Sequence, residues 1–328
     1  MQPNFSQDAA AVCARLLGSR VTGWEAPGGG RQSVRLYLQQ GTVIATRRRR
    51  ANRAALEIEV LRALHAHGAP VPRVLAAGDG WLIQDDLGPR RLSAVVQGAG
   101  APTWLERAID GLHAVHEAGR RACLADSVVP IGASNGWLQA NVLAAPEKVG
   151  RILNLLPPPL DGQKLDLLLS PRTRAFIKWD ARPGNAAARD DDTVAWFDWE
   201  HCGARCALDD LVWLLADEYV DLSPEAEDAI LKRHLDRFVD DRSVAEKLAY
   251  VHTFGSFHLC VRLGLILAYK GTGLWWDPAL CLKQDKVGVT KDAALRICER
   301  GVRWSARARE TAPLAPWFGE IAYQLAST

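Results

Sequence analysis

The spacing of three polar residues between Phe176 and Leu215 constrains this chain more than any other feature. Asp180 is followed by Asn185 five positions later, and Asp198 comes thirteen positions after that. A short apolar run leads into Asp180, and a Pro-Gly pair predicts a loop around it. The two carboxylates and the amide can form one site only if the local structure brings them together.

The residues between Asn185 and Asp198 predict a short β-hairpin. Residues 186–189 and 193–197 favour strands, and three consecutive aspartates form a polar turn between them. A hairpin of this length returns the chain to its starting point, so we expect Asp198 to lie beside Asn185. Two metal ligands would then share one ion despite their separation in the sequence.

These residue types suit the transfer of a phosphoryl group to a hydroxyl. One carboxylate accepts the proton of the acceptor hydroxyl, while an amide oxygen and a second carboxylate hold the Mg²⁺ ions that bridge the nucleotide phosphates. Asp-x-x-x-x-Asn is also the spacing of the kinase catalytic loop. Any one of these residues alone would mean little, because Asp and Asn are common in turns. Their joint spacing predicts a catalytic Asp180 and two metal ligands, Asn185 and Asp198.

The segment resembles the aminoglycoside phosphotransferase and choline kinase family of small-molecule kinases. The family signature is His-Gly-Asp-(three residues)-Gly-Asn, then a hydrophobic run into Ile-Asp-(Trp/Phe)-(Glu/Gly), then Asp-Leu-Ala. The chain has, in the same order, Asp180-Ala-Arg-Pro-Gly184-Asn185, Trp196-Phe197-Asp198-Trp199-Glu200 and Asp210-Leu211. It departs from the signature at Lys178, which stands where the family usually has His.

The resemblance implies a bilobal protein-kinase-like fold of the α+β class, with ATP and Mg²⁺ as cofactors. It also implies transfer of the γ-phosphate to a hydroxyl of a small molecule, of aminoglycoside, sugar or amino-alcohol type. The position of Lys178 mainly braces the catalytic loop in relatives, and its charge could also lie near the transferred group. The resemblance gives Asp210 a bracing role as well, and His116 is expected to be a buried structural residue.

A glycine-rich turn before a predicted strand is a candidate phosphate-binding loop. Gly28, Gly29 and Gly30 can let backbone N–H groups approach phosphate oxygens closely. A triple glycine is also an ordinary hairpin turn, so the sequence leaves both interpretations open. In the family the matching loop carries a Gly followed by a small polar residue, roles that Gly30 and Ser33 would fill.

A run of arginines follows the next predicted strand, residues 41–46. The resemblance places a Lys at the end of this strand, paired with a Glu on the next helix, to hold the α and β phosphates. Arg47 is predicted for this role, with Arg48 as the alternative, because alternation along a strand turns only one of them inward. Glu57 is its predicted partner, and Glu59 is the rival position. The other arginines are expected to be solvated.

Composition excludes several other classes of protein. The chain has 328 residues, 48% hydrophobic and 24% charged, which is ordinary for a globular protein and enough for two lobes. A formal net charge of +2 gives no reason to expect nucleic acid or a membrane as a partner. Seven cysteines without Cys-x-x-Cys spacing indicate reduced thiols and a cytoplasmic location. No signal peptide is recognised, and no apolar run approaches the ~20 residues that cross a bilayer.

The pattern of apolar residues divides the chain into two lobes. Residues 1–84 predict a nucleotide-binding lobe, residues 85–88 a hinge, and residues 89–328 a mainly helical lobe that carries the catalytic and acceptor-binding groups. Gly68 and Gly119 are expected to end two helices. The helices are expected at 9–17, 51–68, 103–119 and 208–220, and in the carboxy-terminal part with interruptions at Pro313 and Pro316.

The acceptor and the oligomeric state stay open at this point. Trp275 or Trp276 could stack on a ring of the acceptor, although packing in the core explains tryptophans equally well. Asp217, Glu218 and Asp221 could attract a cationic acceptor or merely solvate the end of a helix.

A different class of function is also open. Lys178, and Arg in place of the strand Lys, are departures that would suit a catalytically impaired pseudokinase, which binds a nucleotide or metabolite or acts as an interaction scaffold. Magnesium-dependent transfer from ATP would separate the two. A hydrolase is disfavoured because the sequence has no Gly-x-Ser-x-Gly motif and no His-Glu-x-x-His motif.

Overall fold

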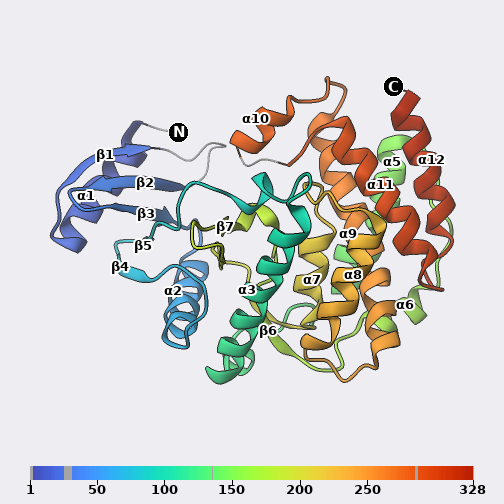
Figure 1. Cartoon of the computed structure of the whole chain (residues 1–328), viewed down its shortest axis with the longest axis horizontal. Helices are drawn as coiled ribbons and strands as arrows, with labels where there is room; N and C mark the ends of the chain where they lie inside the picture. Colours follow the sequence, from blue (N-terminus) through green and yellow to red (C-terminus); the bar gives the residue numbers. More distant parts are fainter. Residues whose placement is uncertain (1–2, 26–31, 135, 285–286, 328) are drawn as a thin grey trace.

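The computed structural model describes residues 3–25, 32–134, 136–284 and 287–327, and it begins with an antiparallel sheet (Figure 1). The five strands pair in the order β1-β2-β3-β5-β4. We call this sheet and its two helices, α1 and α2, the sheet lobe. Its elements are α1 (Pro3–Leu17), β1 (Val21–Glu25), β2 (Ser33–Leu38), β3 (Thr42–Arg47), α2 (Ala51–Ala66), β4 (Val74–Gly78) and β5 (Trp81–Asp85).

The sheet and α1 share a small core of their own. Val34 and Leu36 lie two residues apart on β2 and are both fully buried, as the period-2 alternation of a strand requires. Ala9 and Cys13 lie one turn apart on α1 and are buried against the sheet. One face of each element therefore closes this core.

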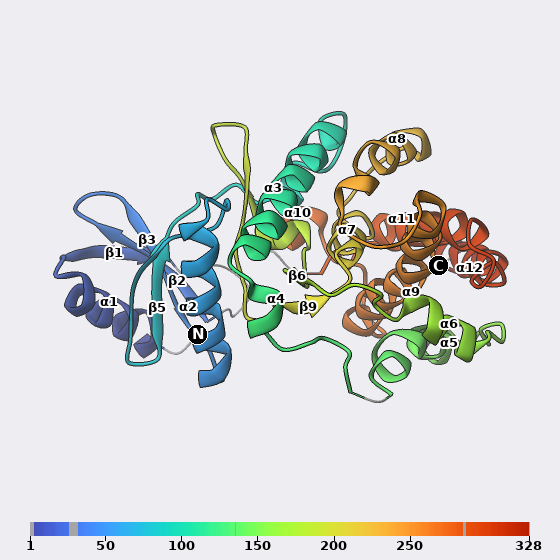
Figure 2. The same ribbon diagram turned by 90° about the horizontal axis from the view of Figure 1, so that it is seen from below.

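Helix α2 belongs instead to the larger core of the molecule. Its Val60, Leu61 and Leu64 are buried among residues of the helical part of the chain. Figures 1 and 2 show α2 at the junction of the two lobes, where it packs against α3 (Ala101–Arg121). Packing therefore fixes the position of α2 relative to the helical part of the chain.

The rest of the chain forms the helical lobe, which makes the whole molecule the predicted α+β arrangement. The long helix α9 (Val244–Lys270) lies at its centre and packs against helices α5, α7 and α11. The other helices are α4 (Leu124–Ser127), α5 (Ala145–Leu153), α6 (Gly162–Leu169), α7 (Leu208–Leu215), α8 (Pro224–His234), α10 (Pro278–Lys283), α11 (Lys291–Ala306) and α12 (Leu314–Ser327). Short 3-10 or π turns occur at Leu92–Ala94, Gln139–Leu143, Pro183–Asn185 and Leu235–Arg237.

Two small two-stranded sheets sit where the lobes meet. Strand β6 (Ala175–Ile177) pairs with β9 (Gly203–Arg205), and β7 (Ala186–Ala188) pairs with β8 (Val194–Trp196). The second pair is the predicted hairpin. The loop from β6 to β7 carries Asp180 and Asn185, and Asp198 follows β8. The strands of these two sheets therefore flank all three residues in the chain and fix their positions.

Helix α3 continues past the glycine that was expected to end it. Gly119 lies inside the helix, and a Cβ atom there would come within 2.6 Å of the Phe176 ring. Gly111 is equally confined, because a Cβ atom would lie 2.8 Å from the carbonyl oxygen of Val194. The glycines serve close packing of α3 on β6 and β8, and so they help to place the loop that carries Asp180 and Asn185.

Three further helix predictions need correction. The first helix begins at Pro3 instead of residue 9, and the helix predicted for 208–220 ends at Leu215. Pro316 does not interrupt α12, because it lies in the first turn, where a missing N–H costs no helical hydrogen bond.

Helix α9 has the length and average hydropathy of a membrane span, although the sequence shows no continuous apolar run of that length. It has 27 residues and a mean hydropathy of 1.4 in its most apolar window, which is long and apolar enough for a bilayer. Of that window, 78% is buried inside the molecule. Its apolar side chains are used for packing against neighbouring helices.

Candidate active site

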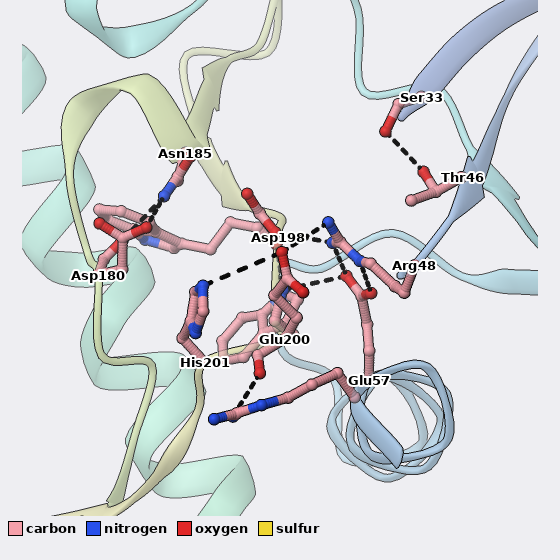
Figure 3. A network of polar contacts seen from close by, with 12 residues as sticks. Ser33, Thr46, Arg48, Glu57, Asp180, Asn185, Asp198, Glu200 and His201 are labelled. Atoms are coloured by element: carbon pink, nitrogen blue, oxygen red, sulfur yellow. Dashed lines mark hydrogen bonds and ion pairs between the residues drawn. The ribbon is translucent and has the colours of Figure 1, made fainter. Parts of the chain in front are cut away.

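The catalytic loop places Asp180 and Asn185 in direct contact (Figure 3). The Asn185 side chain donates from Nδ2 to Asp180 Oδ2 at 2.8 Å and to the Asp180 carbonyl oxygen at 3.0 Å. Both bonds use the amide nitrogen, so the amide oxygen of Asn185 is the atom that could meet a cation. Burial raises the pKa of the Asp180 carboxyl, although the nearby charges of Arg182 and Lys178 oppose the shift. A raised pKa makes the carboxylate a better proton acceptor.

The hairpin brings Asp198 back to this pair as predicted. Ala186 is in register with Trp196, and the Phe197 N–H donates to the Asn185 carbonyl oxygen at 3.1 Å. Asp198 therefore directly follows Phe197, the residue that is hydrogen-bonded to Asn185.

Lys178 ties the two loops together. Its side chain is fully buried, and Nζ donates to the Asp198 carbonyl oxygen at 2.9 Å and to the Asp180 carbonyl oxygen at 3.4 Å. The ammonium also lies 5.2 Å from the centre of the Trp199 ring. Burial lowers the pKa of Lys178, and the charges of nearby aspartates oppose this. Of its two expected roles, these main-chain contacts support bracing of the loop.

Asp210, at the start of α7, holds the same loop from the other side. Its carboxylate accepts from the backbone N–H groups of Lys178 and Trp179, each at 2.8 Å. His116 Nε2 lies 2.8 Å from Asp210 Oδ2. His116 therefore has the structural position that was expected, as a partner of the brace.

The backbone at this site takes an unusual conformation. Trp179, Asp180 and Asp198 have φ values of 48°, 64° and 64°, in the left-handed region that side chains other than glycine rarely occupy. Such residues cluster at functional sites, where the surrounding structure holds the strain. Here the bonds of Lys178 and Asp210 supply that support.

The prediction that Arg47 pairs with Glu57 is wrong, because Arg48 makes that pair. Arg48 donates to Glu57 from Nε at 2.6 Å and from Nη2 at 2.7 Å. Arg47 is the last residue of β3, points to solvent and lies 5.8 Å from the centre of the Trp81 ring. Alternation along β3 turns Thr46 inward and Arg47 outward, so the next residue, Arg48, faces the helical lobe.

Arg48 also reaches two acids across the lobe junction (Figure 3). Nη2 lies 2.7 Å from Asp198 Oδ1, and Nη1 lies 3.1 Å from Glu200 Oε1. Burial alone would lower the pKa of Arg48, but the hydrogen bond to Glu57 and the three acidic charges raise it. The pKa of Asp198 is lowered because the charges of Arg48, Lys178 and His201 outweigh its burial.

Further contacts hold the segment after Asp198 to helix α2. The Trp199 N–H donates to Glu57 Oε1 at 3.1 Å, and Arg53 Nη1 donates to the Glu200 carbonyl oxygen at 2.7 Å. Glu200 and Arg53 received no role from the sequence. Glu200 was visible only as the acid of the Asp-Trp-Glu motif. The expectation that Arg53 is solvated is wrong, because its side chain is half-buried in this contact.

The predicted phosphate loop is only partly described. Gly28, Gly29 and Gly30 lie outside the described residues. Ser33 is the first residue of β2, and its Oγ lies 3.0 Å from Thr46 Oγ1.

The donor set at the junction fits a magnesium ion. Mg²⁺ is usually bound by one or two carboxylates together with substrate phosphates and water. Asp198 and the amide oxygen of Asn185 are hard oxygen donors of this kind. Within the described ranges, no group of three or more His, Cys, Asp or Glu side chains that could hold a metal ion occurs.

Two of the acids and one of the tryptophans that were considered for the acceptor have other contacts. Asp217 and Glu218 are fully buried. Arg182 Nε lies 3.2 Å from Asp217, and Arg262 donates to Glu218 at 2.6 and 2.8 Å. Both carboxylates are therefore already paired with arginines. Trp275 packs against the larger core.

Two cavities occur near these elements, but neither is lined by Asp180, Asn185 or Asp198. A cavity of about 830 Å³ in the helical lobe is lined by α5, α6 and residues 154–160. A second one, of about 440 Å³, is lined by residues 85–87, by His65 near the end of α2, by residues 69–71 and by Ala195 of β8. The candidate site is defined here by the polar contacts at the lobe junction and not by a cavity.

Comparison with known proteins identifies the family. Residues 24–247 match the model of the phosphotransferase enzyme family, and a search of curated sequences gave no match. Among solved structures, the chain is similar to an amicoumacin kinase in complex with AMP-PNP, Ca²⁺ and its ligand (14% identity, TM-score 0.56, covering 87% of this chain and 94% of that one).

Two further structures show the same fold. A spectinomycin phosphotransferase in complex with ADP and spectinomycin has 12% identity and a TM-score of 0.56, with 98% of each chain covered. A choline/ethanolamine kinase family protein from Mesorhizobium loti has 16% identity and a TM-score of 0.55, covering 99% of this chain and 100% of that one. These likenesses confirm the protein-kinase-like fold. Because the family model matches more than half of its length, the chain belongs to the phosphotransferase enzyme family.

Proposed function

We propose that this protein transfers the γ-phosphate of ATP to a hydroxyl group of a small molecule. The observation that carries the proposal is the convergence of Asp180, Asn185 and Asp198 at the junction of the lobes. Nucleotides bound to two of the similar structures support ATP as the donor. The lobe boundary at residues 85–88 and a cytoplasmic location belong to the same proposal.

Each residue has a defined task in this reaction. Asp180 accepts or orients the proton of the acceptor hydroxyl, and its raised pKa favours that task. Asn185 and Asp198 would hold Mg²⁺, which supplies positive charge to the phosphates when bound. Arg48, held by Glu57, would contact the phosphates in place of Arg47, and the loop of Gly28 to Gly30 with Ser33 would cover them. Lys178 keeps the two loops together.

The acceptor is proposed to be a sugar, an amino-alcohol or an aminoglycoside. Two similar structures hold amicoumacin or spectinomycin, which supports a small molecule with hydroxyl groups. Asp217 and Glu218 are not the groups expected to bind an amine of the acceptor, because Arg182 and Arg262 already pair with them.

The proposal is tested with Asp180→Asn in a screen of hydroxyl compounds for ADP production. The amide cannot take the proton, so kcat is expected to fall by about 10²–10⁴-fold while the folded structure and nucleotide affinity persist. Lys164→Ala, an exposed change remote from the site, is the matched control and should leave kcat unchanged. Full activity of Asp180→Asn would refute the assignment, and no transfer by the wild type to any acceptor would favour the pseudokinase.

A further inference from the structure

Arg48 is the centre of an unbalanced group of charges. Its single guanidinium contacts three carboxylates, those of Glu57, Asp198 and Glu200. The side chains of Asp198 and Glu200 are 32% and 27% exposed, whereas Glu57 is almost fully buried at 1%. Two of the three carboxylates are therefore accessible to another cation, and the third is not.

The contacts of Arg48 divide in the same way. The two bonds to Glu57 form a bidentate pair, the arrangement in which arginine and carboxylate associate most strongly. Asp198 and Glu200 each receive a single bond. Arg48 can release Asp198 and keep three of its four contacts.

Asp198 has two competing uses in this arrangement. Its Oδ1 lies 2.7 Å from Arg48 Nη2, and the same carboxylate is the proposed ligand of a divalent cation. A guanidinium and a dication on one carboxylate would repel each other at short range. One of them must therefore weaken the binding of the other.

We propose that Arg48 is a positioning residue that occupies Asp198 until a divalent cation takes that carboxylate, while Glu57 and Glu200 retain the guanidinium for the nucleotide phosphates. The inference rests on the proposed function, because that function makes Asp198 a metal ligand. The inference goes beyond the proposed function by predicting how the affinity for the divalent cation changes when a nucleotide binds. The cation alone binds weakly, and the nucleotide, by drawing Arg48 away, strengthens the binding of the cation.

Arginine suits this exchange better than the lysine usual in kinases. The five N–H donors of arginine can bond several carboxylates at once, and Arg48 makes four hydrogen bonds to three carboxylates here. A lysine has a single ammonium group at the end of a flexible chain, so it could not keep the Glu57 and Glu200 contacts in the same geometry. Lysine should therefore mask Asp198 less.

The test measures Mn²⁺ binding to the nucleotide-free protein by electron paramagnetic resonance, which counts free Mn²⁺ directly. Arg48→Gln removes the competing charge, so Mn²⁺ should bind about tenfold tighter or more than in the wild type, since a charged hydrogen bond of this kind no longer opposes it. Arg47→Gln is the matched control: it removes the same charge one residue away, at an exposed position, and should change Mn²⁺ affinity less than about twofold. Asp198→Asn should abolish the gain when combined with Arg48→Gln.

A second measurement examines the coupling to nucleotide. ADP should tighten Mn²⁺ binding in the wild type, and this effect should shrink in Arg48→Gln because the competition is already gone. Arg48→Lys keeps the charge at the site and should lie between the other two proteins; it serves as the main variant if circular dichroism shows that Arg48→Gln does not fold. A purely structural role of Arg48 would leave Mn²⁺ affinity unmoved in every folded variant.

Equal or weaker Mn²⁺ binding by Arg48→Gln, relative to Arg47→Gln, would overturn the inference. The experiment requires no turnover, so it separates two failures. Absence of ADP production by the wild type counts against the proposed function. Unchanged Mn²⁺ affinity of the Arg48 variants in a protein that does transfer phosphate counts against the exchange alone.

Discussion

The arginine at the lobe junction has more carboxylate partners than the buried arginines inside the helical lobe. Inside the helical lobe, each of three buried arginines has one main carboxylate partner. These pairs are Arg205 with Asp209, Arg262 with Glu218, and Arg300 with Glu227. All six side chains are at most 3% exposed. At the junction, one arginine faces three carboxylates, and two of those are partly exposed.

This difference in partner number distinguishes the ion pairs that stabilise the helical lobe, the scaffold, from the group that forms the candidate site. A matched pair that is fully buried has no charge left for a ligand, and exchanging its partner would leave a desolvated ion. The group around Arg48 leaves two carboxylates in reach of solvent, so it can take a cation. The helical-lobe pairs hold the walls, and the junction group does the chemistry that we propose.

The largest expected effect comes from breaking a matched pair. Glu227 accepts from Arg300 Nε at 2.8 Å and from Trp304 Nε1, which are both buried, and more weakly from the partly exposed Arg303 at 3.4 Å. Glu227→Gln leaves the Arg300 charge without a counter-ion and should cost about 3–5 kcal/mol of unfolding free energy. Glu200→Gln, the matched change at the junction, should cost less than about 1 kcal/mol, because Glu200 is partly exposed.

Chemical denaturation with urea measures both costs. Phosphoryl transfer per folded molecule should persist in Glu227→Gln, since its side chain lies in the scaffold. Equal destabilisation by the two changes would remove the distinction between the matched pairs and the junction group.

The sequence predicted the geometry of the catalytic loop because that geometry depends on near neighbours. Strand and turn preferences act over a few residues, and a hairpin of known length must return Asp198 to Asn185. The choice between Arg47 and Arg48 depends on where β3 ends relative to the inward face. That boundary is set by pairing with β5, and a shift of one residue reverses which side chain faces inward.

Long-range pairing was beyond the sequence for the same reason. Asp217 and Glu218 looked like an exposed acidic patch, yet Arg262 reaches them from α9, more than forty residues later. Gly119 looked like the end of a helix, yet its lack of a side chain admits Phe176 from β6. In both cases the deciding partner comes from a distant element, and local propensity carries no information about it.

A second prediction concerns acid stability of the matched pair at Glu218. Burial by itself raises the pKa of the Glu218 carboxyl, but the charge and hydrogen bonds of Arg262 outweigh burial and lower it to about 2. The folded state therefore binds this proton less readily than the unfolded chain, where the pKa of Glu is about 4.3. Its contribution to stability is present above pH ~4.3 and is lost as pH falls towards 2.

Unfolding free energy measured between pH 5 and pH 2.5 tests this directly. Wild-type stability should fall over this window with a contribution of up to about 1.4 kcal/mol per pH unit from Glu218. Glu218→Gln should start less stable and lose stability with a shallower slope, because it has no proton to take up. Glu25→Gln, at an exposed carboxylate, is the control. Parallel slopes for Glu218→Gln and the wild type would show that the pair does not carry the acid sensitivity.

The smallest expected effect lies at the start of α9, the helix that carries Arg262. Ser243 Oγ accepts from the Glu246 N–H, and the Glu246 carboxylate accepts from the Ser243 N–H at 2.9 Å, which is a capping box. Ser243→Ala should cost about 1 kcal/mol of unfolding free energy. Mn²⁺ affinity at Asp198 should not change, because the capping bonds lie within the helical lobe and do not involve the group around Arg48. If this remote substitution altered Mn²⁺ binding as much as Arg48→Gln does, the junction group would respond to general loosening of the helical lobe, and the separation of scaffold from site would fail.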